Sequence, residues 1–389
     1  MRDAEREKRA RLKELNVKLS RVFFLFLAVL LPLSTLSIAY PCTTFVLRQG
    51  NRLVFGRNLD WVTGSGVMMI NQRHLQKAAL VDPSERPIKW ISRYGSITFN
   101  QVGRDLPYGG INEAGLVVEH MTLDGTVYPP RDSRCAIGAC QWIQFQLDNY
   151  STVEEVLSSD TLLRITDANS RFHFLVCDRS GHVATIEFLN GKMVRHTGKE
   201  LPLEALANST YEESLRCYGE SPDAPADPSL GNFVTAARLT DRRDSSAGES
   251  AIDHAFRALH AVSQGVGTKW SIVYDITNMR IYFKIFETPT IVGPQKIFLK
   301  EPGVAILKIV DFHGFDFSCS AVGKVLDLDL NKEGVVNQYF RDYSTSINKE
   351  FIVKAFTFFK SWGINIQLND EAIDYLARYP ESFKCISEN

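Results

Sequence analysis

A cysteine near the start of the chain and two charged residues that follow it are the side chains best suited to chemistry. Cys42 opens the segment Cys42-Thr-Thr44, and the segment Gly56-Arg-Asn-Leu-Asp-Trp61 carries Arg57 and Asp60. As the first residue of a mature chain, Cys42 would combine a thiol with an α-amine whose pKa near ~7.7 suits a general base. Arg57 would lower the pKa of the thiol by favouring the thiolate, and Asp60 would orient the protonated amine. Such a set attacks an amide carbon without a histidine.

The first forty residues determine whether Cys42 can become a new N-terminus. Residues 2–21 hold eight Lys or Arg against four Asp or Glu, and residues 22–33 are almost entirely apolar. Ser37-Ile-Ala39 supplies small residues for cleavage, so the pattern predicts an export signal. Cleavage after Ala39 would leave Tyr40 and Pro41 ahead of Cys42, so release of its amine requires a further trimming step.

An uncleaved membrane anchor is the alternative interpretation of this N-terminal segment. Residues 22–39 number eighteen, which is close to a membrane-spanning length. Pro32 and the hydroxyl residues at 34, 35 and 37 argue against a spanning helix. We therefore expect an exported chain, periplasmic or secreted, that meets a membrane only if the signal is not removed.

Composition excludes several classes of protein. The 389 residues are 44% hydrophobic and 23% charged, and 44 basic side chains balance 45 acidic ones, so nucleic acid is not an expected partner. Seven cysteines occur without a Cys-x-x-Cys pair, which indicates neither a zinc ribbon nor a dense disulfide framework. Cys135 and Cys140 lie close in sequence, and we expect buried thiols or a disulfide there rather than a metal site.

Short strands separated by turns dominate the pattern beyond Cys42, and helices interrupt them. Strands are predicted at residues 43–47, 53–55, 96–99, 115–118, 172–176, 183–188, 270–274 and 280–284. Helices are predicted at residues 140–147, 153–157, 251–262, 348–362 and 370–379, and a loop at 219–229. Hairpins in place of regular βαβ crossovers favour an α+β fold. The last two helices belong to residues 330–389, a C-terminal extension without recognisable chemistry.

Several motifs in a consistent order resemble one known family. They are Cys42-Thr-Thr44, Gly56-Arg-Asn-Leu-Asp-Trp61, Lys89-Trp-Ile-Ser-Arg-Tyr-Gly-Ser96, Gly110-Ile-Asn-Glu-Ala-Gly-Leu116, Ala207-Asn208-Ser209 and Trp270-Ser-Ile-Val-Tyr-Asp275. Together they resemble the choloylglycine hydrolase family, which contains bile salt hydrolases and penicillin V acylases. The likeness extends from Cys42 to about residue 329, most of the chain beyond the signal.

The resemblance implies a fold and a set of site residues. The fold is the four-layer αββα sandwich of N-terminal nucleophile hydrolases, here residues 42–329, after a signal and short pro-segment at 1–41. Cys42 is implied as the nucleophile, with Arg57 and Asp60 supporting it. The side chain of Asn208 and the backbone N–H of Thr122 are implied as donors to the oxyanion. No cofactor or metal is implied.

The implied reaction is hydrolysis of a linear, non-peptide C–N amide bond in a small N-acyl substrate. Conjugated bile salts, penicillin V and N-acyl homoserine lactones all fit. By the same resemblance we expect a periplasmic protein and a homo-oligomer, a tetramer. One departure stands out: the family has Arg-Phe-Val-Arg where this chain has Asn232-Phe-Val-Thr235, so Arg238 is the candidate to replace the missing arginine.

Two alternatives follow from the residues. Glu119 and His120 follow a predicted strand, and a papain-like pairing of Cys42 with His120 is one alternative for the chemistry. The other is a non-catalytic, membrane-tethered binding protein that keeps the hydrolase fold. The missing arginine at Thr235, the long basic segment and the C-terminal extension motivate it.

Overall fold

The computed structural model describes residues 41–166, 170–220, 225–241, 248–286, 305–361 and 369–386, and the backbone of the short strands β17 (Ile291–Val292) and β18 (Ile297–Phe298). The predicted export signal and its Ala39 cleavage position lie outside the described residues. Pro41 is the first described residue, directly ahead of Cys42.

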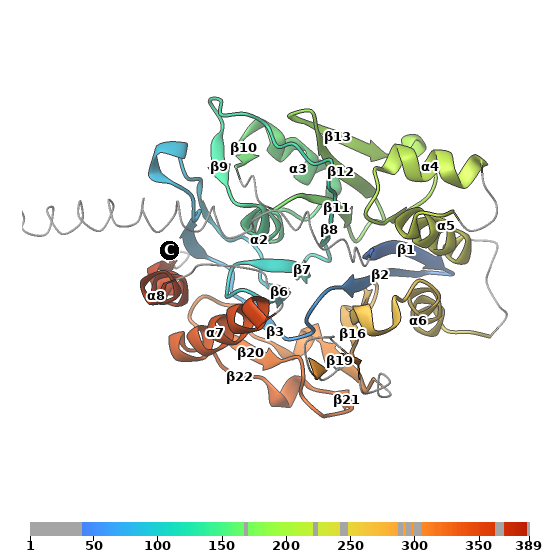
Figure 1. Ribbon diagram of the computed structural model, residues 1–389. Coiled ribbons are helices and arrows are strands. Elements are labelled where there is room, and N and C mark those ends of the chain that lie inside the picture. The colour runs from blue at the N-terminus through green and yellow to red at the C-terminus, as the bar shows by residue number, and fades with distance from the viewer. Residues whose placement is uncertain are drawn as a thin grey trace, which may run out of the picture.

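Two large sheets form the body of the molecule (Figure 1). The seven-stranded sheet has the spatial order β14 (Ala205–Leu206), β1 (Thr43–Gln49), β2 (Arg52–Asp60), β15 (Thr268–Asp275), β16 (Arg280–Ile285), β19 (Leu307–Asp311) and β21 (Gly334–Val335). The nine-stranded sheet has the order β13 (Lys192–Thr197), β12 (Val183–Leu189), β11 (Phe172–Cys177), β8 (Val117–Thr122), β7 (Pro107–Asn112), β6 (Ser96–Asn100), β3 (Val67–Asn71), β20 (Lys324–Asp327) and β22 (Arg341–Asp342).

Smaller elements surround these sheets. The short strands are β4 (Leu75–Ala78), β5 (Lys89–Ile91), β9 (Cys135–Ile137), β10 (Leu163–Ile165) and β23 (Lys384–Cys385). The helices are α2 (Ala139–Asn149), α3 (Val153–Ser158), α4 (Tyr211–Glu220), α5 (Pro228–Thr240), α6 (Ala251–Ala261), α7 (Thr345–Ser361) and α8 (Asp370–Arg378). Helices α5 and α6 pack on β1 and β2, whereas α2 packs on β7 and β8.

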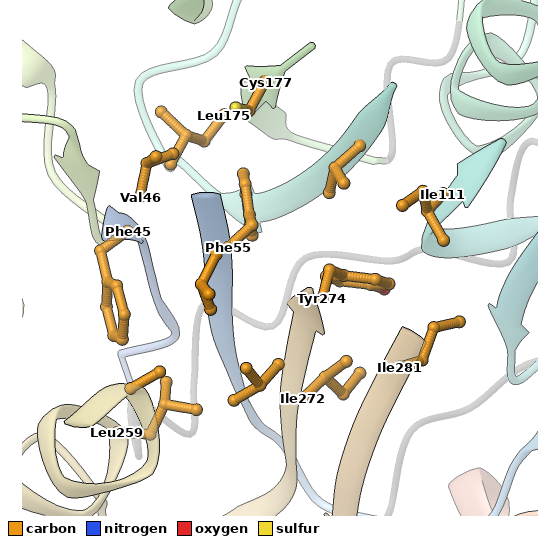
Figure 2. Packing of buried hydrophobic residues seen from close by; sticks show 14 of the residues in the cluster. Phe45, Val46, Phe55, Ile111, Leu175, Cys177, Leu259, Ile272, Tyr274 and Ile281 are labelled. Atoms are coloured by element: carbon orange, nitrogen blue, oxygen red, sulfur yellow. The ribbon is translucent and has the colours of Figure 1, made fainter. Parts of the chain in front are cut away.

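One apolar core fills the space between the two sheets. Phe99 of β6 packs its ring against Trp270 and Tyr274 of β15 and against Phe283 of β16. Figure 2 shows residues of both sheets meeting in this cluster. Alternating strand residues direct one face inward, so sheet-on-sheet packing buries both apolar faces. The α+β class predicted from the sequence is therefore confirmed.

The hairpin that carries the candidate nucleophile is longer than predicted. Strands β1 and β2 pair from Thr43 opposite Asn58 to Gln49 opposite Arg52. Gly50 in the connecting turn adopts φ +60°, a conformation that glycine accepts without strain. The hairpin therefore holds residues 43–60 in one continuous antiparallel ladder.

Two predicted boundaries are wrong. The loop predicted at 219–229 is too long at both ends, since α4 extends to Glu220 and α5 begins at Pro228. Asp227 caps α5 by accepting from the backbone N–H of Ser229, and proline suits the first helical turn. The strand predicted at 115–118 begins at Val117, because Gly115 adopts φ +88° in the preceding turn.

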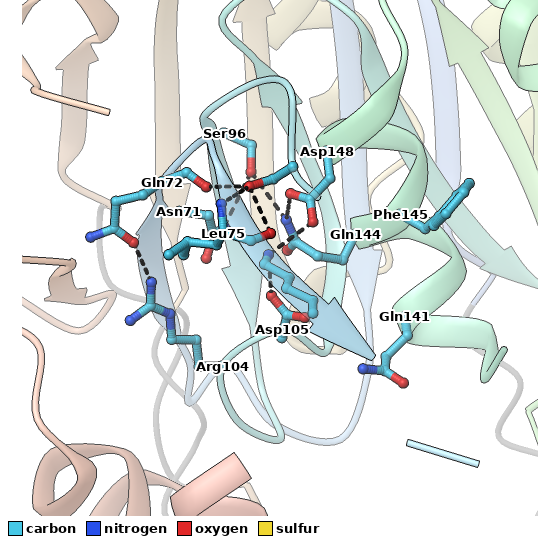
Figure 3. Close-up of polar contacts among 12 residues, drawn as sticks. Asn71, Gln72, Leu75, Ser96, Arg104, Asp105, Gln141, Gln144, Phe145 and Asp148 are labelled. Atoms are coloured by element: carbon cyan, nitrogen blue, oxygen red, sulfur yellow. Dashed lines mark hydrogen bonds and ion pairs between the residues drawn. The ribbon is translucent and has the colours of Figure 1, made fainter. Parts of the chain in front are cut away.

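A buried polar cluster and one disulfide attach the peripheral elements. Lys77 of β4 lies 2.7 Å from Asp105 and 2.8 Å from Asp148 of α2. Figure 3 shows Asp105 and Asp148 among the polar contacts of this region. Cys319 and Cys385 form a disulfide that ties the end of the C-terminal extension to the body. Within the described part of the chain Cys135 and Cys140 are free thiols of intermediate burial, so the predicted bridge is wrong and the predicted thiols are present but not fully buried.

Candidate active site

The hairpin brings the three predicted residues together. Cys42 lies directly before β1, while Arg57 and Asp60 lie on β2, where Thr44 pairs with Arg57. The backbone N–H of Asp60 donates to Cys42 Sγ at 3.5 Å, and the thiol donates back to the Asp60 carbonyl at 3.6 Å. Antiparallel pairing thus sets the sulfur against the end of the return strand.

The thiol of Cys42 is protonated in this environment. Burial raises its pKa to about 12, the Asp60 carboxylate adds to the rise, and the Arg57 guanidinium opposes it. The predicted influence of Arg57, which lowers the pKa of the thiol, is confirmed, but desolvation of the thiolate outweighs it. In the uncut chain Cys42 is therefore a weak nucleophile.

Asp60 is held by Thr268, a residue of the neighbouring strand β15 that the sequence analysis did not single out. Thr268 of β15 pairs with Asp60 in the sheet, and its hydroxyl donates to Asp60 Oδ1. Burial raises the pKa of Asp60 to about 7, although the Thr268 hydroxyl and Arg57 both oppose the rise. Among the described residues nothing hydrogen-bonds Oδ2, so one buried carboxylate oxygen is left to accept a proton donor.

Arg57 makes its contacts with the other sheet. Its Nε lies 3.0 Å from Glu119 Oε2 of β8, and its Nη2 donates to the His120 carbonyl at 3.1 Å. The side chains of Arg57 and Glu119 are fully buried. The sequence drew attention to Glu119 only as a neighbour of His120, and its pairing with Arg57 was not predicted.

The papain-like alternative is not supported by the surroundings of His120. Its Nδ1 contacts the Tyr108 carbonyl at 2.5 Å, and its ring packs against Phe172 at a centroid distance of 4.0 Å. Burial and Arg57 lower its pKa well below the ordinary value, so the imidazole is neutral. The hydrogen bonds of the Cys42 thiol are made with Asp60 instead.

Asn208 and Thr122, implied as oxyanion donors, meet each other. Asn208 Nδ2 donates to the Thr122 carbonyl at 2.7 Å, and the Asn208 backbone N–H donates to Ser229 Oγ at 2.8 Å. Strand β14 pairs with β1 so that Thr44 faces Leu206. Continued by two residues, this antiparallel offset sets position 208 opposite position 42. Asn208 itself lies beyond the end of β14, and its described hydrogen bonds are made with Thr122 and Ser229.

Helix α5 supplies Asn232, not Arg238, to this region. Asn232 is buried, and its Nδ2 contacts the Pro41 carbonyl at 3.0 Å, Thr43 Oγ1 at 3.1 Å and the Val262 carbonyl at 3.2 Å. Arg238 is exposed on the same helix. The structure thus puts Asn232 in contact with the residues on either side of Cys42, and the replacement of the missing arginine by Arg238 stays a hypothesis.

The described residues do not suggest a metal site. No group of three or more His, Cys, Asp or Glu side chains among them is arranged to hold a metal ion. Searching the same residues for a helix both long and apolar enough to cross a membrane finds none.

Comparison with known proteins agrees with this geometry. A family model for linear amide C-N hydrolases of the choloylglycine hydrolase family matches residues 42–215, which include Cys42, Arg57, Asp60 and Asn208. The match covers less than half of the chain, and over these residues the chain is similar to the choloylglycine hydrolase family. The resemblance that the motifs suggested is thereby confirmed.

Individual members of the choloylglycine hydrolase group show how far the similarity extends. Penicillin V acylase of Pectobacterium atrosepticum is 27% identical over 200 residues, which are 46% of this chain and 52%, about half, of that protein. The structure of penicillin V acylase from Agrobacterium tumefaciens superposes with a TM-score of 0.64 at 24% identity, covering 78% of this chain and 98% of that one. Conjugated bile acid hydrolase from Clostridium perfringens superposes with a TM-score of 0.56 at 15% identity, covering 76% and 98%.

Proposed function

We propose that this chain hydrolyses a linear amide bond in a small N-acyl substrate, with Cys42 as its nucleophile. The observation that carries the proposal is the contact of the Cys42 thiol with Asp60, on a hairpin that also carries the buried Arg57. The two facing sheets with helices on their outer sides suit the four-layer αββα arrangement of an N-terminal nucleophile hydrolase.

Removal of everything before Cys42 would start the chemistry. The freed α-amine then takes the thiol proton, and the thiolate attacks the substrate carbonyl carbon. The tetrahedral intermediate expels the amine, which receives a proton, and the acyl group remains on sulfur as a thioester. Water hydrolyses the thioester to release the acid and restore the thiol. Asp60 Oδ2, which accepts nothing among the described residues, is suited to bind the protonated α-amine.

The oxyanion of the intermediate needs donors that are already in place. Asn208 Nδ2 carries a second N–H besides the one donated to the Thr122 carbonyl, and the strand register, continued by two residues, sets position 208 opposite position 42. The backbone N–H of Thr122 is the proposed second donor. These roles follow from the register and from the family resemblance together.

The uncut chain would be inactive on this mechanism. Its α-amine is part of the Pro41–Cys42 peptide bond, and burial keeps the thiol protonated with a pKa of about 12. Asn232 holds the Pro41 carbonyl at 3.0 Å, so trimming of Tyr40 and Pro41 must release this contact.

Substrate and location remain proposals. Conjugated bile salts, penicillin V and N-acyl homoserine lactones are the candidate substrates, and the first two classes appear in the names of the relatives above. The Cys319–Cys385 disulfide supports export, because disulfides persist in oxidising compartments. The predicted homo-oligomer and the role of residues 330–389 stay predictions.

The test combines processing with turnover. We expect mass spectrometry of the isolated protein to find Cys42 at the N-terminus. The three substrate classes are then screened for amine release. Cys42→Ser should reduce release by at least ~10²-fold, because an alkoxide is far harder to form than a thiolate. Unchanged turnover in that variant contradicts the assigned nucleophile. A protein that keeps Pro41 and hydrolyses none of the three favours the tethered binding protein instead.

A further inference from the structure

The ion pair between Glu119 and Arg57 spans the two sheets inside the core. Glu119 lies on β8, with strands β7 and β11 on either side, and Arg57 lies on β2 of the other sheet. Their charged atoms are 3.0 Å apart, and both side chains have an exposed fraction of 0%. The atoms are close enough for an ion pair but lack the direction of a full hydrogen bond.

The three guanidinium nitrogens of Arg57 have different surroundings. Nε faces Glu119, and Nη2 donates to the His120 carbonyl at 3.1 Å. Nη1 is buried and has no hydrogen-bond partner within the part of the chain that the structure describes. Glu119 and His120, adjacent on β8, therefore hold Nε and Nη2 of Arg57 and leave Nη1 free to donate.

The carboxylate of Glu119 is itself closely fitted. Tyr274 of β15 donates its hydroxyl to Oε1 at 2.5 Å. Gly109 lies opposite Glu119 in the neighbouring strand, and a Cβ at that position would be 1.9 Å from Oε2. The glycine therefore provides the space that the carboxylate occupies, and any larger residue there would displace it.

Stability alone does not account for this pair. Two charges removed from water lose hydration that their mutual attraction seldom repays, and apolar replacements of a buried pair are often as stable. The pair acts instead on the nucleophile: Arg57 lowers the pKa of the Cys42 thiol, whereas Glu119 raises it. Asp60 also raises it, while His120 is neutral and Tyr274 holds its proton.

We propose that Glu119 is a positioning residue for Arg57. Glu119 fixes the guanidinium so that Nη1 is the donor offered to the reacting groups. Burial raises the pKa of Glu119 to about 7, and above that pH its negative charge also limits how strongly Arg57 stabilises the thiolate. The proposal rests on the proposed function, since it assumes that Cys42 is the attacking group. It extends that function by assigning a role to a residue of the opposite sheet.

Glu119→Gln tests this role, because glutamine keeps the size and an acceptor for Tyr274 but removes the charge. The rate of Cys42 alkylation by iodoacetamide reports the thiolate fraction, measured on the Cys42 peptide by mass spectrometry because other free thiols are present. With Arg57 no longer neutralised, we expect alkylation about tenfold faster at the same pH, one pKa unit. Amide turnover should fall, because Nη1 is no longer fixed. A purely structural residue would not separate these two effects.

Glu187→Gln is the matched control. Glu187 is equally buried on β12 of the same sheet, but it pairs with His173 and the Tyr211 backbone rather than with Arg57. In Glu187→Gln, Cys42 should be alkylated at the same rate as in the unaltered protein. Tyr274→Phe is the second variant if Glu119→Gln does not fold, because loss of that hydroxyl raises the pKa of Glu119 and should speed alkylation by a smaller factor.

Alkylation that is unchanged or slower in Glu119→Gln overturns the proposal, as does acceleration of the same size in Glu187→Gln. The alkylation arm needs no substrate. If the unaltered protein hydrolyses no amide, the proposed function fails while the rates still decide the role of Glu119.

Discussion

The side-chain amide of Asn232 donates to the carbonyl of Pro41, the residue directly ahead of the candidate nucleophile, at 3.0 Å. The same nitrogen also contacts Thr43 Oγ1 and the Val262 carbonyl. One helix residue therefore fixes the chain on both sides of Cys42, at the position where the family motif carries an arginine.

Asn232→Ala should destabilise the precursor and disturb its processing. The loss of these contacts in a buried region should lower the free energy of unfolding by about 1–3 kcal/mol. Trimming must break the contact with the Pro41 carbonyl, so we also expect a larger fraction of chains that begin at Cys42, measured by intact-mass analysis after expression. Arg238→Ala on the exposed side of the same helix is the control. Equal processing in the two variants would contradict a role for Asn232.

Thr268→Val should shift the pH profile of the reaction. The Thr268 hydroxyl lowers the pKa of Asp60, which burial has raised to about 7. Without this donor the pKa of Asp60 rises further, so the acidic limb of kcat/KM should move to higher pH. Ser271→Ala, which removes a buried hydroxyl bound to Asn58 on the same strand, should leave the limb in place.

Asp60→Asn should change how stability depends on pH. The folded-state pKa of Asp60 lies near 7, above its ordinary value of 3.8, so its ionisation opposes folding. Below pH 3.8 Asp60 makes its full favourable contribution to the free energy of unfolding, on the order of 4 kcal/mol. This contribution is lost as the pH rises through about 7. Unfolding by denaturant at pH 4 and pH 8 should show a smaller loss of stability in the variant. If the free energy of unfolding falls by the same amount between pH 4 and pH 8 in both proteins, the raised pKa of Asp60 is refuted.

Cys385→Ser should loosen the C-terminal extension. The disulfide joins residues 66 positions apart, and removing such a link typically costs ~2–4 kcal/mol. The midpoint of denaturant unfolding should fall, and reductant should lower the midpoint of the unaltered protein but not that of Cys385→Ser. Cys217→Ser, which removes a thiol outside the disulfide, should unfold like the unaltered protein.

Local patterns in the sequence predict the hairpin well. Two short apolar runs and the Gly50 turn place both strands before any tertiary contact is known, and the hairpin sets Cys42 against Asp60. The start of α5 is harder to predict, because the Pro- and Asp-rich segment that looks like a loop also contains the Asp227 cap and Pro228 at the first helical turn.

Contacts between distant segments were not predictable. Thr268 meets Asp60 across 208 positions, and nothing in the local sequence marks that pairing. The same is true of Glu119 and Arg57, which come from different sheets. Asn208 and Thr122 were found only through resemblance to a family, because their meeting depends on how β14 and β8 are placed.

Burial of Cys42 also bears on how the chain acquires its disulfide. Thiol–disulfide exchange proceeds through the thiolate, so a thiol with a pKa of about 12 reacts slowly with oxidants and with other cysteines. Cys319 and Cys385 can therefore join while Cys42 stays out of the exchange. On the proposed mechanism, the fold keeps the candidate nucleophile unreactive as long as the peptide bond ahead of it is intact.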